Sequence, residues 1–223
     1  MQTMKKPLEH VYWLGGASCT GKSSHAKAIA RRFGFHVYHT DEHAFGTYMF
    51  GIPEAEILPA VARYRELILK GIDDFATRAA DVSFAAFTAF CREVFPLLVR
   101  DLAALSPQRV IAEGAQLFPE LVASCAVKGQ AVFLTAAPEF RETIWKKEMN
   151  GEIPGGNQYE IENFNKSVIQ DKIVRAHAAF HDLIAAHISA GARAHDFPCV
   201  AADGGRGEAD IENRILELFS IVV

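Results

Sequence analysis

The sequence has 223 residues, half of them apolar, which is enough chain to bury a full hydrophobic core and excludes a small scaffold held together by disulfides. Its formal net charge of −4 argues against a protein that binds nucleic acid by neutralising phosphates, because such proteins carry a strong basic excess. We therefore expect a small-molecule partner and no nucleic acid.

The first residues and the cysteines indicate in which cellular compartment the protein is expected. Residues 1–7 hold two lysines and lead straight into a strand-like run, unlike a signal peptide, and no stretch reaches the roughly 18 apolar residues of a membrane helix. The four cysteines, Cys19, Cys91, Cys125 and Cys199, form no Cys-x-x-Cys pair. We expect a cytoplasmic protein with reduced thiols and no membrane partner, and the oligomeric state stays open.

The chain starts with a strand, a loop and a helix. An apolar run at residues 11–14 ends at two glycines, apolar positions recur at helical spacing over 22–33, and residues 35–39 alternate like a second strand. Residues 53–105 are patterned as an all-helical insertion of two to four short helices. Pro59 and Pro96 are expected in first turns of those helices, where a missing N–H does no harm.

The second half of the chain alternates strands and helices. Apolar runs at 109–114 and 131–135 are typical of buried parallel strands. They are followed by a basic helix at 140–147, a Gly-rich loop at 150–157, a long helix at 168–188, a strand at 197–201 and a terminal helix at 211–219. This alternation predicts one α/β domain over residues 1–223.

One motif carries specific chemistry. Residues 16–23, Gly-Ala-Ser-Cys-Thr-Gly-Lys-Ser, match the P-loop pattern between a predicted strand and a predicted helix. In such a loop backbone N–H groups surround the β-phosphate, Lys22 reaches the β- and γ-oxygens, and the Ser23 hydroxyl binds Mg²⁺. The predicted nucleotide-binding residues are Gly16, Ala17, Ser18, Cys19, Thr20, Gly21, Lys22, Ser23 and Ser24.

Two acids follow predicted strands. Asp41 stands where ligands of open parallel sheets bind, so it can orient and deprotonate an acceptor hydroxyl or hold Mg²⁺ through water; the alternative is a helix N-cap. Glu113 closes the third strand, where P-loop proteins carry a metal-linked acid; the alternative is a carboxylate bonded to loop amides. We expect Asp41 to be catalytic and Glu113, with Ser23, to hold the metal, although the sequence leaves open which acid is the base.

The loop at 15–24, Asp41, Glu113-Gly114 and the basic segment after the fourth strand together resemble the P-loop small-molecule kinases of the nucleoside-monophosphate-kinase type, including shikimate, gluconate and chloramphenicol kinases. The resemblance implies a three-layer fold with parallel strand order 2-3-1-4-5. It also implies that the helical insertion at 53–105 helps to hold the acceptor and that a lid at 140–165 closes on ATP. The adenylate kinase string Asp-Gly-Phe-Pro-Arg is replaced by Glu-Gly-Ala-Gln-Leu at 113–117, which argues against a nucleotide acceptor.

Cations in the predicted lid, Arg141, Lys146 and Lys147, can neutralise charge on the transferring phosphoryl group, with a solvated basic surface as the alternative; we expect Arg141 to be catalytic together with Lys22 and Asp41. The i, i+4 pair His177 and His181 is expected on a surface or half-buried helix face, and no metal besides Mg²⁺ is expected.

The sequence thus predicts an ATP- and Mg²⁺-dependent kinase for a small-molecule phosphate acceptor, with a P-loop ATPase or a nucleotide-binding module as the alternative. A GTPase is not indicated, because the chain lacks Asn-Lys-x-Asp.

Overall fold

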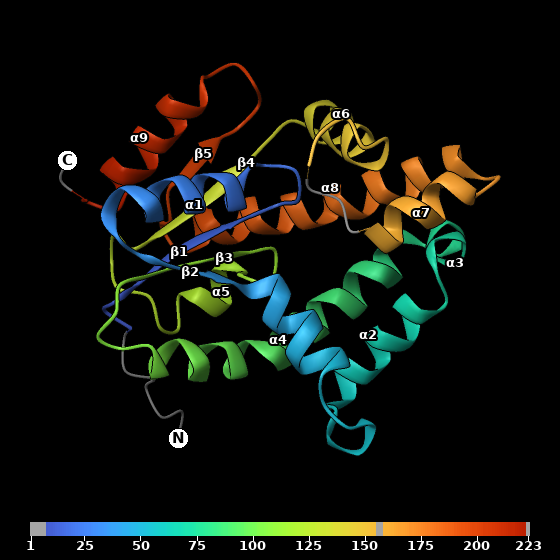
Figure 1. Ribbon diagram of the computed structural model, residues 1–223, viewed down its shortest axis with the longest axis horizontal. Coiled ribbons are helices and arrows are strands. Elements are labelled where there is room, and N and C mark those ends of the chain that lie inside the picture. Colours follow the sequence, from blue (N-terminus) through green and yellow to red (C-terminus); the bar gives the residue numbers. More distant parts are fainter. Residues whose placement is uncertain (1–7, 155–157, 222–223) are drawn as a thin grey trace.

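The computed structural model describes residues 8–154 and 158–221 and is built around one parallel sheet (Figure 1). The strands are β1 (Val11–Gly16), β2 (His36–His39), β3 (Val110–Gly114), β4 (Ala131–Thr135) and β5 (Cys199–Ala201). Their order is β2-β3-β1-β4-β5, and every pairing is parallel. The predicted strand order is therefore confirmed.

Helices cover both faces of the sheet (Figure 1). The side chains of β1 point alternately into two hydrophobic cores, one on each face. Tyr12 and Leu14 pack toward α1 (Lys22–Phe33) and α9 (Glu208–Leu218). Val11 and Trp13 face the opposite side, which is covered by α4 (Ala80–Ala104), α5 (Pro119–Val122) and α8 (Gln170–Ala194). The arrangement gives three layers, as the resemblance implied.

The chain between β2 and β3 is helical. It comprises a π-helix η1 (Glu42–Phe50), a 3₁₀ turn η2 (Glu54–Glu56), α2 (Pro59–Leu69), α3 (Ile72–Thr77) and α4. Pro59 opens α2 as expected. The helical character of 53–105 and the number of α-helices agree with the prediction, but α4 is not short, because it runs for 25 residues.

Pro96 lies inside α4, so its expected first-turn position is wrong. Its side chain is exposed, and the carbonyl oxygen that loses its N–H partner one turn earlier belongs to Arg92, also exposed. Water can therefore bind that carbonyl, and the helix continues. Against expectation, α4 is also long and apolar enough to cross a membrane by length and composition, but it packs against α2 and α8 as a core helix.

The second half of the chain completes the layers. It holds α6 (Pro138–Met149) and α7 (Gln158–Lys166), which contact each other, and then α8. The predicted long helix 168–188 begins at Gln170 and continues to Ala194, and β5 is shorter than the predicted strand 197–201. Part of the predicted loop at 150–157, residues 155–157, lies outside the described residues.

Candidate active site

The loop between β1 and α1 has its lysine folded back over it. Lys22 is 7% exposed, and its Nζ donates a hydrogen bond of 2.6 Å to the carbonyl oxygen of Ala17. The Thr20 hydroxyl donates to the same oxygen at 2.8 Å. Both donors converge on one carbonyl oxygen, so the Lys22 ammonium group is held against the backbone of the loop.

Glu113 joins the P-loop to two strands. It is 2% exposed near the end of β3 and pairs in the sheet with Leu14 of β1 and His39 of β2. Its Oε1 accepts the Ser23 hydroxyl at 3.1 Å and lies 2.5 Å from His39 Nδ1. Among the described residues, the partners of the Glu113 carboxylate are side chains and not loop amides, so the alternative reading of Glu113 finds no support.

The Glu113 site also fits a divalent cation. Among the described residues nothing hydrogen-bonds its Oε2, although that oxygen is buried. A carboxylate oxygen without a partner beside a hydroxyl is the kind of oxygen donor set that Mg²⁺ prefers, with water completing the shell. Ser23 and Glu113 therefore fit the metal that the sequence analysis assigned to them.

Asp41 lies just beyond β2 and belongs to a second polar cluster. Gln116 Nε2 donates to Asp41 Oδ1 at 2.5 Å, and Gln116 Oε1 accepts the Thr40 hydroxyl at 2.8 Å. Thr40 also reaches the Glu113 carbonyl oxygen at 2.9 Å. Asp41 stands at the start of η1 with helical dihedral angles and no side-chain cap bond, so the N-cap alternative finds no support.

Burial and charge oppose each other at Asp41. Burial raises the pKa of its carboxyl above 3.8, and Glu113 adds to that effect. The Gln116 hydrogen bond, the Lys22 charge and His39 lower the same pKa. A carboxylate with a raised pKa near the P-loop lysine is suited to accept a proton.

Gly114 lets β3 end tightly against Thr40. Its φ is +153°, and a Cβ atom there would lie 1.8 Å from Thr40 Oγ1. We expect Gly114→Ala to lower the free energy of unfolding by about 2 kcal/mol or more in urea titrations, from backbone strain and overlap together. Gly34→Ala is the control, because Gly34 also has a positive φ but open space around it. Equal losses in the two variants would show that the overlap with Thr40 does not matter.

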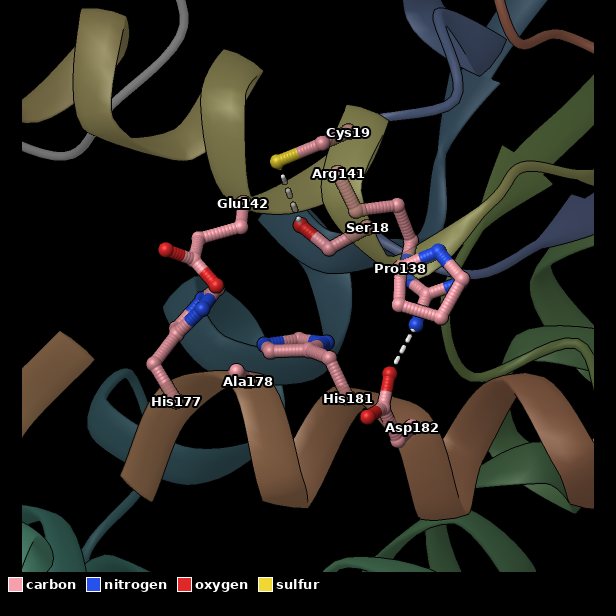
Figure 2. Close-up of a pocket in the computed structure, with 9 residues that line it drawn as sticks. All are labelled: Ser18, Cys19, Pro138, Arg141, Glu142, His177, Ala178, His181 and Asp182. Carbon is pink, nitrogen blue, oxygen red and sulfur yellow. Dashed lines mark hydrogen bonds and ion pairs between the residues drawn. The ribbon is translucent and has the colours of Figure 1, made fainter. Parts of the chain in front are cut away.

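Arg141 is the cation of the predicted lid that faces the P-loop. It is 6% exposed, its Nη1 donates to the Ala136 carbonyl oxygen at 2.6 Å, and its Nη2 pairs with Asp182 of α8. Arg141, Ser18 and Cys19 line one small pocket, of about 10 Å³. Figure 2 shows their side chains around it. By contrast, Lys146 pairs with Glu142 at 2.6 Å and is half exposed, which fits the alternative of a solvated basic surface.

His177 and His181 lie at this same pocket. Both are half-buried, as expected, and rise from α8 toward the P-loop side chains (Figure 2). The His177 ring stacks on Trp145 with centroids 4.0 Å apart. Burial, with the Arg141 and Lys22 charges, lowers the pKa of His181 to about 3, so its ring is neutral at physiological pH.

Two residues of the site were not singled out from the sequence: Thr40 and Gln116. Gln116 follows Gly114 by two positions, and a polar residue so soon after a buried strand was the available signal. Glu148 of α6 is a third, because its Oε2 accepts the Cys19 thiol at 3.7 Å. Burial raises the pKa of Glu148, while the Cys19 bond and the Lys22 charge lower it.

No family model matches the sequence, and no curated protein matches it. Solved structures do match in fold. Shikimate kinase from Bacteroides thetaiotaomicron aligns with a TM-score of 0.53 at 13% identity, covering 95% of this chain and 98% of that one. Shikimate kinase from Acinetobacter baumannii in complex with shikimate (TM-score 0.41, 13% identity, 97% and 94% covered) and dephospho-CoA kinase from Campylobacter jejuni (TM-score 0.39, 9% identity, 95% and 96% covered) also align.

The chain therefore has the fold of the P-loop small-molecule kinases, as predicted from its resemblance to that group. The alignment with the Bacteroides thetaiotaomicron enzyme spans nearly the whole of both chains.

Proposed function

We propose that the protein is an ATP-dependent phosphotransferase that phosphorylates a hydroxyl group of a small molecule. The observation that carries this proposal is that the P-loop and a half-buried acid, Asp41, lie at the carboxyl ends of β1 and β2, on either side of β3. Lys22 acts electrostatically on Asp41, and Glu113 links β3 to Ser23 of the loop. AAA-type and transporter ATPases carry an acidic pair after the third strand, whereas Glu113 is followed here by Gly114, which argues against those classes.

In the proposed reaction the acceptor oxygen attacks the γ-phosphorus of ATP, and its proton passes to Asp41. The bond between the γ-phosphorus and the bridging oxygen breaks, and its electron pair leaves with ADP. Lys22 and the loop N–H groups stabilise charge on the phosphate oxygens throughout. Mg²⁺ held by Ser23 and Glu113 would neutralise β- and γ-phosphate oxygens.

A screen of acceptors tests this function. The protein is incubated with ATP, Mg²⁺ and single members of a panel of sugars, sugar acids, nucleosides and aminoglycoside-like antibiotics, and phosphorylated product is measured by mass spectrometry. The expected result is ADP formation that depends on one acceptor class, with equal amounts of phosphorylated acceptor. ATP hydrolysis without a phosphorylated acceptor would support a P-loop ATPase instead, and binding without turnover would support a nucleotide-binding module.

Arg141 is proposed to act on charge that develops during transfer, because it borders the P-loop side chains Ser18 and Cys19. We expect Arg141→Ala to lower kcat by about 10-fold, as loss of a charged hydrogen bond would. The dissociation constant of ADP, measured by calorimetry, should change much less. Lys146→Ala on the exposed side of α6 is the control and should keep full activity. An equal loss in ADP affinity and in kcat would assign Arg141 to nucleotide binding alone.

A further inference from the structure

Gln116 is completely buried in the candidate active site. It is not among the residues proposed to bind phosphate. Its amide joins two residues that follow β2, Thr40 at 2.8 Å and Asp41 at 2.5 Å, across about a third of the chain. A fully buried amide needs partners for its polar atoms, and here both partners belong to the segment that carries the proposed base. Gln116 therefore acts on Asp41 directly.

The orientation of the amide follows from its neighbours. Thr40 has one hydroxyl proton, and its two acceptors are the Glu113 carbonyl oxygen and Gln116 Oε1. If the amide were flipped, Gln116 Oε1 would face the Asp41 carboxylate, and two acceptors would meet without a proton between them. Because an ionised carboxylate can only accept, Asp41 keeps the Gln116 N–H group turned toward it.

We infer that Gln116 is a positioning residue: it binds Oδ1 of Asp41 and leaves Oδ2 to accept the proton of the acceptor hydroxyl. Among the residues that the structure describes, no hydrogen bond reaches Oδ2. Carboxylates rotate about the Cβ–Cγ bond, and a bond to one oxygen fixes the plane of both. This inference rests on the proposed function, in which Asp41 is the base.

A double-mutant cycle tests whether Gln116 works through Asp41. Gln116→Met keeps the side-chain length but removes both hydrogen bonds, and we expect kcat to fall about 10- to 100-fold with little change in the KM for ATP. In an Asp41→Asn background the same substitution should change kcat less than about 2-fold, because the residue it positions is gone. Gln108→Met, at an exposed glutamine just before β3, is the control. Equal losses in both backgrounds would overturn the inference.

A second measurement does not depend on enzymatic turnover. The titration of the Asp41 carboxyl carbon is followed by NMR in the wild type and in Gln116→Met and Gln116→Glu. Both variants remove the N–H donor that lowers the pKa of Asp41, so the midpoint should move to higher pH. Gln116→Met adds no charge, whereas Gln116→Glu adds a carboxyl group whose negative charge would raise the same pKa further. The other charged and titratable groups around Asp41 are the same in both variants: Lys22 of α1, His39 of β2, Glu113 of β3, Tyr64 of α2 and Cys91 of α4.

The two measurements separate the two proposals. If no acceptor is phosphorylated, the proposed function is wrong, and the titration then decides the pairing alone. A midpoint that rises in both Gln116 variants supports the pairing. A midpoint that stays at the wild-type value in both, with folded protein by circular dichroism, overturns it whatever the acceptor screen shows.

Discussion

Replacing Lys22 with alanine is expected to abolish nearly all ATP turnover while the protein stays folded. The ammonium group is almost fully buried within the loop that would surround the β-phosphate. Removing one donor of this kind from a site that stabilises transition-state charge lowers kcat by about 10²- to 10³-fold, and a full positive charge is lost here as well. ATP turnover with the best acceptor and the affinity for ATP are the quantities to measure.

The fold should survive the loss of Lys22 because its side chain touches the loop rather than the hydrophobic cores. Its hydrogen bond goes to the Ala17 carbonyl oxygen, which keeps Thr20 as a second donor. Thermal melting followed by circular dichroism checks this point. Lys27→Ala is the matched control, since Lys27 is exposed on the same helix and should keep wild-type turnover. Wild-type turnover in Lys22→Ala itself would refute the phosphate-binding role of the loop.

Strands and the P-loop could be predicted because their signals are local. All residues of β3 are buried, and its first three residues, Val110, Ile111 and Ala112, form an apolar run that predicts a buried strand. The P-loop combines a fixed spacing with a flanking strand and helix, so one short window is enough to find it. The strand order came from the family resemblance and not from these windows.

The polar network around Asp41 could not be predicted from windows of sequence. Gln116 and Asp41 lie 75 residues apart, and only the parallel pairing of β2 with β3 brings their loops together. The same holds for Asp101 of α4, whose carboxylate accepts the Tyr48 hydroxyl at 2.5 Å and the Tyr38 hydroxyl at 3.1 Å. Neither carboxylate has a sequence signal that names its partner. Its place after a predicted strand therefore singled out Asp41, but the sequence pointed neither to Asp101 nor to the groups that hold either carboxylate.

Asp41→Asn should lower acceptor-dependent kcat by about 10²- to 10⁴-fold and leave the affinity for ATP nearly unchanged. An asparagine keeps the shape of the side chain and can still accept the Gln116 hydrogen bond through its oxygen, but it cannot take up the acceptor proton. Asparagine also caps helices as well as aspartate does, so a capping role would leave turnover unchanged. Unchanged turnover would exclude Asp41 as the base and leave Glu113 as the candidate.

The pH dependence of kcat/KM provides a second test of Asp41 as the base. Asp41 must be ionised to accept a proton, so activity should fall as the pH drops through its pKa in the free enzyme. Burial raises that pKa above 3.8, and the acidic limb should therefore lie at higher pH than that of an exposed aspartate. Asp41→Asn should lose this limb from its residual activity. Glu42→Gln is the control, because it changes the neighbouring, exposed carboxylate. It should keep both the acidic limb and the wild-type rate, since the proton acceptor, the Asp41 carboxylate, is still present.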